Sequence, residues 1–164
     1  MNLASKITKT SKKTTSKLRN KKVIVDDYTF DSEMEANYYN FLKEEVAAGH
    51  IYKIDLQPEF ILLESFKKDG KTYHEMKYIG DFKIYNSEDP NDYYIVDIKG
   101  FTTVDFKLKL KLFHYKYRDI KLLLITYDSP TQQWCTLEEH RKLIKERKKL
   151  KQEKKNQKSK DKVK

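Results

Sequence analysis

An acid and a lysine interrupt an otherwise apolar, β-forming segment at residues 93–100 (YYIVDIKG). In a β-strand, alternate side chains point to opposite faces, so Asp97 and Lys99 share one face with Ile95 while Val96 points to the other. A charged pair on the face of an apolar strand is costly to bury unless its members are paired or bind something. This segment is therefore the first candidate for a site with chemistry.

A second acid lies in the preceding β-like segment, residues 78–85 (YIGDFKIY), where Asp81 follows Gly80. If the two segments pair as a hairpin, Asp81 and Asp97 lie close together. Two neighbouring carboxylates repel each other, and a divalent cation relieves that repulsion. Because hard oxygen ligands select Mg²⁺ or Mn²⁺ over zinc, the pair predicts a site for one of these two ions.

A third carboxylate, Glu35, lies on a predicted helix at the edge of the stripe that includes Tyr39 and Leu42. We expect Asp81 and Asp97 to hold the metal, with Glu35 as a third or water-mediated ligand. A lysine two residues after a metal-binding Asp is suited to orienting an attacking water or stabilising a charged phosphate, which is the role predicted for Lys99. A metal ion polarises the scissile phosphate. The set therefore suits phosphodiester hydrolysis.

Each of these residues also has a purely structural interpretation. Ser32-x-x-Glu35 matches a capping box, in which the glutamate only bonds the backbone at the start of a helix. Asp97 and Lys99 match an ordinary salt bridge on an exposed strand, and Asp81 matches a solubilising residue at a strand edge. The chemical interpretation depends on the order of the three acids and the lysine along the predicted elements.

The elements that must position these residues follow the order α-β-β-β-α-β. Helical spacing of apolar residues predicts helices at 32–48 and 104–117, and a further helix at 137–150. The predicted strands are residues 51–63 (interrupted at Gln57-Pro58), 73–85, 93–99 and 120–127. The first three are expected to form antiparallel hairpins, and the last two a βαβ crossover. The expected fold is α/β, with a mixed central sheet flanked by helices.

Charge divides the chain into three parts. Residues 1–22 hold eight Lys/Arg and no Asp/Glu, residues 141–164 hold thirteen and three, and the total is +10, which leaves −8 for residues 23–140. We expect a disordered basic arm, an acidic folded domain, and a basic tail that is helical at first and then disordered. Basic arms suit a polyanion such as nucleic acid, although solvated ends are the simpler alternative.

Composition argues against a membrane or secreted protein. No apolar run approaches the roughly 20 residues of a membrane span, and the N-terminus lacks an apolar signal stretch. Cys135 is the single cysteine, so no internal disulfide forms. A cytoplasmic location is expected.

The order helix-Glu, strand-Asp, strand-Asp-x-Lys resembles the PD-(D/E)XK nuclease superfamily. More narrowly, the chain is similar to small phage proteins related to Holliday-junction resolvases. The segments that carry this resemblance are FDSEMEANYYNFL (30–42), LQPEFIL (56–62), KYIGDFKIY (77–85), YIVDIKG (94–100) and FKLKLKLF (106–113).

The resemblance implies a restriction-endonuclease-like fold and a Mg²⁺-dependent endonuclease acting on branched DNA, within a bacterial host if the protein is phage-encoded. Its catalytic residues fall on Glu35, Asp81, Asp97 and Lys99. Two departures stand out. Asp97 occupies a position where many members have Glu, and Gly80 stands where the motif's proline would be.

Candidate DNA contacts surround this set. Gln57 matches a polar position that the family often keeps near the site. Thr102 precedes the second helix, and Lys107, Lys109 and Lys111 lie on it, from where they are expected to reach the DNA backbone. The alternative for these lysines is the solvent face of an amphipathic helix.

Two symmetric cuts in a four-way junction need two active sites, so a homodimer is expected for a resolvase. The competing functions are a nuclease of the same fold with another role, such as nicking, end processing or transposon-end cleavage, a non-catalytic DNA-binding protein, and a structural or scaffolding protein with solvated tails.

Overall fold

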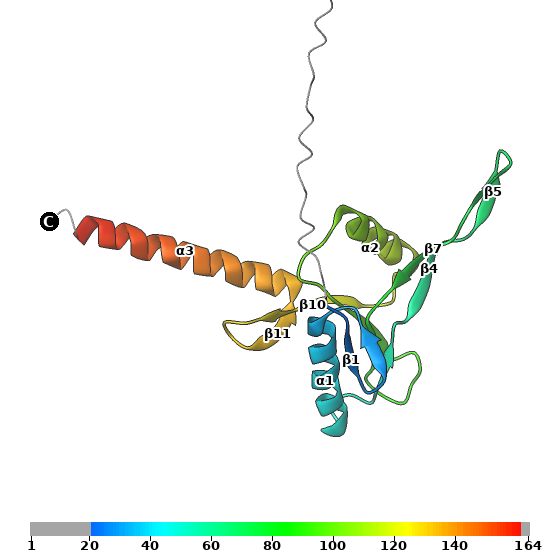
Figure 1. The fold of residues 1–164 in the computed structure, drawn as a ribbon, viewed down its shortest axis with the longest axis horizontal. Helices are drawn as coiled ribbons and strands as arrows, with labels where there is room; N and C mark the ends of the chain where they lie inside the picture. The colour runs from blue at the N-terminus through cyan, green and yellow to red at the C-terminus, as the bar shows by residue number, and fades with distance from the viewer. Residues whose placement is uncertain (1–20, 162–164) are drawn as a thin grey trace, which may run out of the picture.

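The computed structural model describes residues 21–161 (Figure 1). Most of the predicted N-terminal basic arm, residues 1–20, lies outside the described residues, as does the end of the predicted tail, residues 162–164.

A five-stranded mixed sheet forms the centre of the fold. Its spatial order is β11-β10-β9-β8-β3, in which β9 and β10 are parallel and the other neighbours antiparallel. The strands are β3 (Lys53–Leu56), β8 (Phe82–Tyr85), β9 (Tyr93–Ile98), β10 (Leu122–Asp128) and β11 (Gln133–Thr136). The predicted α/β class with a mixed sheet flanked by helices is confirmed. The predicted hairpin between the segments of Asp81 and Asp97 and the parallel pairing around the second helix are confirmed too.

Helices α1 (Glu33–Ala47) and α2 (Val104–Lys116) cover opposite faces of this sheet (Figure 1). Val96 belongs to the core on the α1 side with Leu42, whereas Ile95 belongs to the core on the α2 side with Phe113. The alternation predicted for β9 is therefore confirmed.

Both helices begin at residues whose side chains cap them. The Ser32 hydroxyl accepts a hydrogen bond from the Glu35 amide at 3.2 Å, and that of Thr103 accepts one from the Phe106 amide at 3.1 Å. Each bond satisfies an amide that has no partner within the helix, so these caps fix where the helices start. At the other end of α1, Gly49 adopts a φ of +76°, which a glycine adopts without strain.

The two long predicted strands before β9 are each broken in two. Gln57, with φ of +51°, and Pro58 separate β3 from β4 (Glu59–Leu63), as predicted. The prediction of one continuous strand over 73–85 is wrong, because the segment is interrupted at Gly80 and Asp81, between β7 (Met76–Ile79) and β8. Beyond these facing breaks β4 and β7 continue as a separate antiparallel pair.

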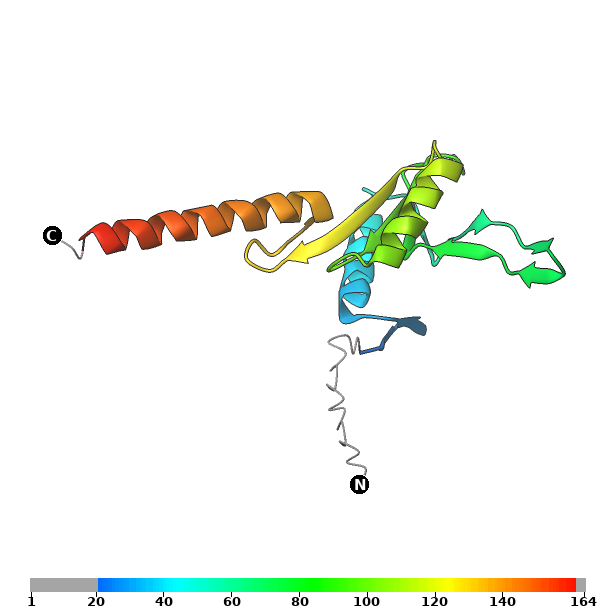
Figure 2. The same ribbon diagram turned by 90° about the horizontal axis from the view of Figure 1, so that it is seen from above.

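Two further hairpins flank the sheet. β1 (Val23–Val25) and β2 (Tyr28–Phe30) are joined by Asp26 and Asp27, both at positive φ as in a type I′ turn. β5 (Phe66–Lys68) and β6 (Lys71–Tyr73) form a second hairpin. This hairpin projects away from the sheet on the side opposite α3 (Figures 1 and 2).

Helix α3 (Leu137–Asp161) is longer than predicted. The sequence indicated a helix only to residue 150 and disorder beyond it. The helix instead continues through a segment rich in Lys and Gln, which favour helix, and it extends away from the sheet (Figure 2). No helix within residues 21–161 has the length and apolarity needed to cross a membrane.

Candidate active site

Asp81 lies at the point where the β7–β8 segment bends away from the central sheet. Its amide donates to the carbonyl of Val96 at 3.1 Å, and its carbonyl accepts from the Gln57 amide at 3.0 Å. Gly80 allows this bend because a Cβ there would lie only 2.7 Å from Cγ2 of Ile95, a buried core residue. The absence of a side chain at Gly80 thus allows a close approach of backbone to core, which the sequence did not predict.

The carboxylate of Asp81 continues the pairing between β8 and β9. Its Oδ2 accepts a 2.6 Å hydrogen bond from the Ile98 amide, one residue past Asp97 on β9. This bond holds the Asp81 side chain beside that of Asp97. Burial, followed by repulsion from the Asp97 carboxylate, raises the pKa of Asp81 from 3.8 to about 8. The predicted proximity of the two acids is confirmed.

Asp97 is buried, with 1% of its surface exposed, and its two oxygens have different surroundings. Oδ2 accepts a 2.6 Å hydrogen bond from the hydroxyl of Tyr78 on β7. Oδ1 forms an ion pair with the ammonium of Lys99 and has no other partner among the described residues. A buried charge is stable only when it is paired or coordinates a metal, and Lys99 supplies the pairing here.

Lys99 connects Asp97 to solvent. Its ammonium lies 5.2 Å from the centre of the Phe106 ring, and 28% of its side chain is exposed. Burial alone would lower the pKa of Lys99, but the neighbouring carboxylates of Asp97 and Asp81 outweigh burial and raise it. Lys99 is therefore a permanent cation at the edge of the acidic pair.

Glu35 has both of the roles that the sequence indicated. As a capping residue, it accepts hydrogen bonds from the Ser32 hydroxyl at 2.8 Å and the Asp31 amide at 3.1 Å. Its charge also reaches the acidic pair, because it adds to the rise in the pKa of Asp81 and of Lys99. The capping-box interpretation is confirmed, and it does not exclude the electrostatic one.

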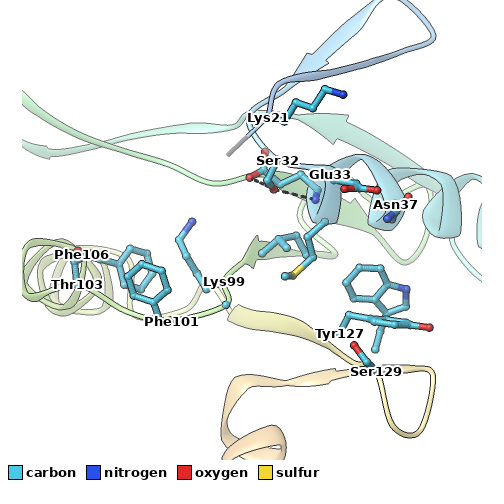
Figure 3. A pocket seen from close by; sticks show the side chains of 15 residues that line it. Lys21, Ser32, Glu33, Asn37, Lys99, Phe101, Thr103, Phe106, Tyr127 and Ser129 are labelled. Carbon is cyan, nitrogen blue, oxygen red and sulfur yellow. Dashed lines mark hydrogen bonds between the residues drawn. The ribbon is translucent and has the colours of Figure 1, made fainter. Parts of the chain in front are cut away.

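A cavity of about 890 Å³ opens beside these residues. Figure 3 shows Lys99, Phe101 and Phe106 on one wall, the start of α1 with Ser32 and Glu33 facing them, and Tyr127 with Ser129 farther along. Glu35 lines this cavity and also a smaller one of about 80 Å³ that Asp81 and Gln57 line. The candidate site therefore lies between two openings.

The residues present fit Mg²⁺ or Mn²⁺ only as a two-carboxylate site. Across residues 21–161, no three His, Cys, Asp or Glu side chains are grouped closely enough to hold a metal ion, so Glu35 is not a third direct ligand in this arrangement. Mg²⁺ is commonly bound through one or two carboxylates together with waters and substrate phosphates. Asp81 and Asp97 supply that number, with Oδ1 of Asp97, which is paired with Lys99, as one ligand atom.

The predicted DNA-contacting residues divide into two groups. Gln57 lies at the break beside Asp81, as expected. Lys107, Lys109 and Lys111 are exposed on α2 and do not line the large cavity. Thr102 does not line it either; its neighbour Thr103 does.

Two residues of the site did not stand out in the sequence. Tyr78 binds Asp97 from a neighbouring strand, and Phe106 packs under Lys99 from α2. Tyr78 lies three residues before Asp81, in the same β-like segment, but only the pairing of the strands shows that its hydroxyl reaches Asp97.

Comparison with known proteins gives a family without an assigned activity. No curated protein and no solved structure matches the chain. One family model, described as "Protein of unknown function (DUF1064)", matches residues 15–130, a range that contains Glu35, Asp81, Asp97 and Lys99. Because the match covers more than half of the 164 residues, the chain belongs to the DUF1064 family.

Proposed function

We propose that this protein is a metal-dependent endodeoxyribonuclease with a restriction-endonuclease-like core. The observation that carries the proposal is the pairing of Asp81 with Asp97 at the end of the β8–β9 ladder, with Lys99 bound to Asp97. Burial and the neighbouring Asp97 carboxylate make the charged form of Asp81 costly in the metal-free fold, so an arrangement of this kind is better explained by a ligand than by stability.

Each residue has a distinct part in this proposal. Asp81 and Asp97 hold Mg²⁺ or Mn²⁺, which when bound would polarise the scissile phosphate. Lys99 donates hydrogen bonds from its ammonium to the attacking water or to a phosphate oxygen. Tyr78 holds Asp97 in place through Oδ2, while Oδ1 is paired with Lys99. Glu35 contributes negative charge near the pair and is in reach of the site through water.

The proposed substrate is branched DNA, and the proposed role is resolution of Holliday junctions by a homodimer. The sequence resemblance supports this substrate, and the charge distribution supports a polyanion. Residues 23–140 carry −8, whereas residues 141–161 of α3 carry eleven Lys/Arg against three Asp/Glu, or +8. An acidic domain repels DNA, so a basic element must hold the substrate over the site.

A non-catalytic DNA-binding protein is the second candidate. The observation that favours it is the absence, within residues 21–161, of three grouped metal-ligating side chains. A protein that only binds DNA, however, has no use for two adjacent carboxylates, which repel a phosphate. We therefore place it second.

Cleavage of a labelled four-way junction and of a linear duplex, with Mg²⁺ or EDTA, tests the proposal. Wild type, Asp97→Ala and Asp119→Ala are compared, the last removing an exposed acid. The proposal expects metal-dependent cutting of the junction that only Asp97→Ala abolishes. Equal cutting of both substrates supports the nuclease activity and contradicts the specificity for junctions. Binding without cutting by wild type in Mg²⁺ or Mn²⁺ overturns the proposal that the protein is an enzyme.

A further inference from the structure

The large cavity has one charged end and one aromatic end. Glu35 and Lys99 line the charged end next to the acidic pair, and Tyr127 and Trp134 line the cavity where β10 and β11 pair. Phe101, in the loop before α2, lines it close to Lys99 (Figure 3). Hydrolysis of a phosphodiester uses only the charged end, so the aromatic lining is left without a role.

Phe101 is exposed in a way that core packing does not explain. Of its surface, 53% is accessible, and within the described residues it has no close contact with another aromatic ring. Phe106, five residues on, instead packs beneath the Lys99 ammonium and against Tyr78 at 6.3 Å between ring centres. The Phe101 ring is therefore free to accept a flat partner next to Lys99.

The other end of the cavity offers a second aromatic surface. Trp134 packs one side against Tyr38, with 4.8 Å between ring centres, and contacts Tyr127 at 5.0 Å, while 37% of Tyr127 is exposed. Ser129 and Asn37 add polar groups to the lining. Aromatic rings combined with hydrogen-bonding side chains are the surroundings that a nucleobase needs.

We propose that this cavity binds an unpaired nucleobase next to the phosphate that is cut, with Phe101 as the stacking residue. The inference rests on the proposed function for its choice of a nucleic acid. In a fully paired duplex both faces of each base are covered by neighbouring pairs, so an exposed ring has nothing on which to stack. A base freed at a branch point offers its face, which gives the site a physical means of preferring branched DNA.

The single tryptophan makes this proposal directly measurable. Trp134 is the only tryptophan of the chain, and it lines the cavity, so its fluorescence reports on occupancy of this cavity. Titrations in EDTA with a duplex that carries a bulge of unpaired thymines, and with the same duplex fully paired, separate base binding from backbone binding. We expect quenching by the bulged duplex and about tenfold tighter binding of it.

Two substitutions supply the matched comparison. Phe101→Ala should remove most of the preference for the bulged duplex and leave affinity for the paired duplex unchanged. Tyr115→Ala removes another exposed aromatic, 72% accessible, which lies on α2 outside the cavity, and should change neither affinity. Phe101→Tyr, which keeps a stacking ring, should retain the preference.

The results distinguish this inference from the proposed nuclease activity, because no cleavage is needed. Equal affinity for the two duplexes, or an equal effect of Phe101→Ala and Tyr115→Ala, overturns the base site whether or not the protein cuts DNA. A preference that depends on Phe101 supports the base site even in a protein that proves unable to cut.

Discussion

The hydroxyl of Tyr78 donates a 2.6 Å hydrogen bond to Oδ2 of Asp97, and both residues are buried. The bond joins β7, which has left the central sheet, to β9, which remains in it. It therefore fixes the direction in which the other oxygen of Asp97 points. Residues that orient a metal-binding carboxylate in this way affect metal affinity without touching the metal.

Tyr78→Phe should lower both stability and the affinity for Mg²⁺. Loss of a donor to a buried carboxylate costs about 1–3 kcal/mol of unfolding free energy, which denaturant titration measures. The Mg²⁺ concentration for half-maximal cleavage should rise by about 10–100-fold.

Tyr117→Phe is the matched control for Tyr78→Phe. It removes a hydroxyl that donates to the carbonyl of Ile61 at 3.0 Å, on the same side of the sheet but away from Asp97. It should lower stability and leave the Mg²⁺ dependence of cleavage unchanged. If both variants shift the Mg²⁺ dependence equally, Tyr78 has no special part in orienting Asp97.

The pH dependence of stability should reveal the cost of charging the buried Asp81 carboxyl group. Its folded-state pKa is raised from 3.8 to about 8, first by burial and then by Asp97. Between these two pH values the folded state binds a proton that the unfolded state has released. The contribution of Asp81 to stability is therefore full below pH 4 and is lost as pH rises through 8. In EDTA, Asp81→Asn should gain stability relative to wild type over this window, as measured by thermal unfolding.

Mg²⁺ should reverse this difference. Metal binding requires deprotonated carboxylates, so it stabilises wild type most at the upper end of the window. Asp81→Asn should lose that stabilisation. Parallel pH profiles of the two proteins in EDTA, or an equal effect of Mg²⁺ on both, would show that the acids are not coupled.

The parts of the site that the sequence predicted are those set by local rules. Alternation along β9 placed Val96 and Asp97 on opposite faces, and the serine-to-glutamate spacing placed Glu35 in a cap. Both depend on residues within a few positions of one another. The pairing of Asp81 with Asp97 was also predicted, because it requires only that consecutive strands form a hairpin.

The parts that were not predicted depend on tertiary contacts. The break at Gly80 and Asp81 leaves little trace in the sequence. At the break, the Ile98 amide donates to the side-chain carboxylate of Asp81 instead of to a backbone carbonyl of the neighbouring strand. The cavity is lined from α1, α2 and the β10–β11 pair, so no single segment indicates it. The length of α3 was underestimated because a segment without apolar periodicity indicates disorder as well as helix.

A buried ion pair anchors α3 to the sheet. The guanidinium of Arg147 donates to both oxygens of Asp128 at 2.6 Å, and the Thr131 hydroxyl adds a third bond at 2.6 Å. The guanidinium lowers the pKa of Asp128 from 3.8, so the contribution of this pair to stability is full above pH 4 and is lost progressively as pH falls from 4 toward the lowered pKa of the folded state.

Arg147→Ala should lower the melting temperature clearly at pH 7 and less at pH 2. Lys148→Ala, which removes an exposed neighbouring charge, should have little effect at either pH. Limited trypsin digestion should cut within α3 sooner in Arg147→Ala than in Lys148→Ala. A difference between Arg147→Ala and wild type that does not change with pH would contradict the ion pair as the anchor.

Removal of residues 149–164 should weaken DNA binding and leave the domain folded. The buried side of α3 ends at Arg147, and residues 148–157 are exposed. The removed segment contains eight lysines and two acids, a loss of six positive charges. Each lysine that contacts a phosphate contributes about 0.9 to the slope of log affinity against log salt, so the slope should become shallower. The rate of cleavage at saturating DNA should stay the same, since the proposed site is intact.

Replacement of the eight lysines by glutamine in the full chain separates the effect of charge from that of helix length. If this variant binds DNA as weakly as the truncated protein, the charge of the tail holds the DNA. An unchanged salt slope in both proteins would show that the tail is only a solvated end.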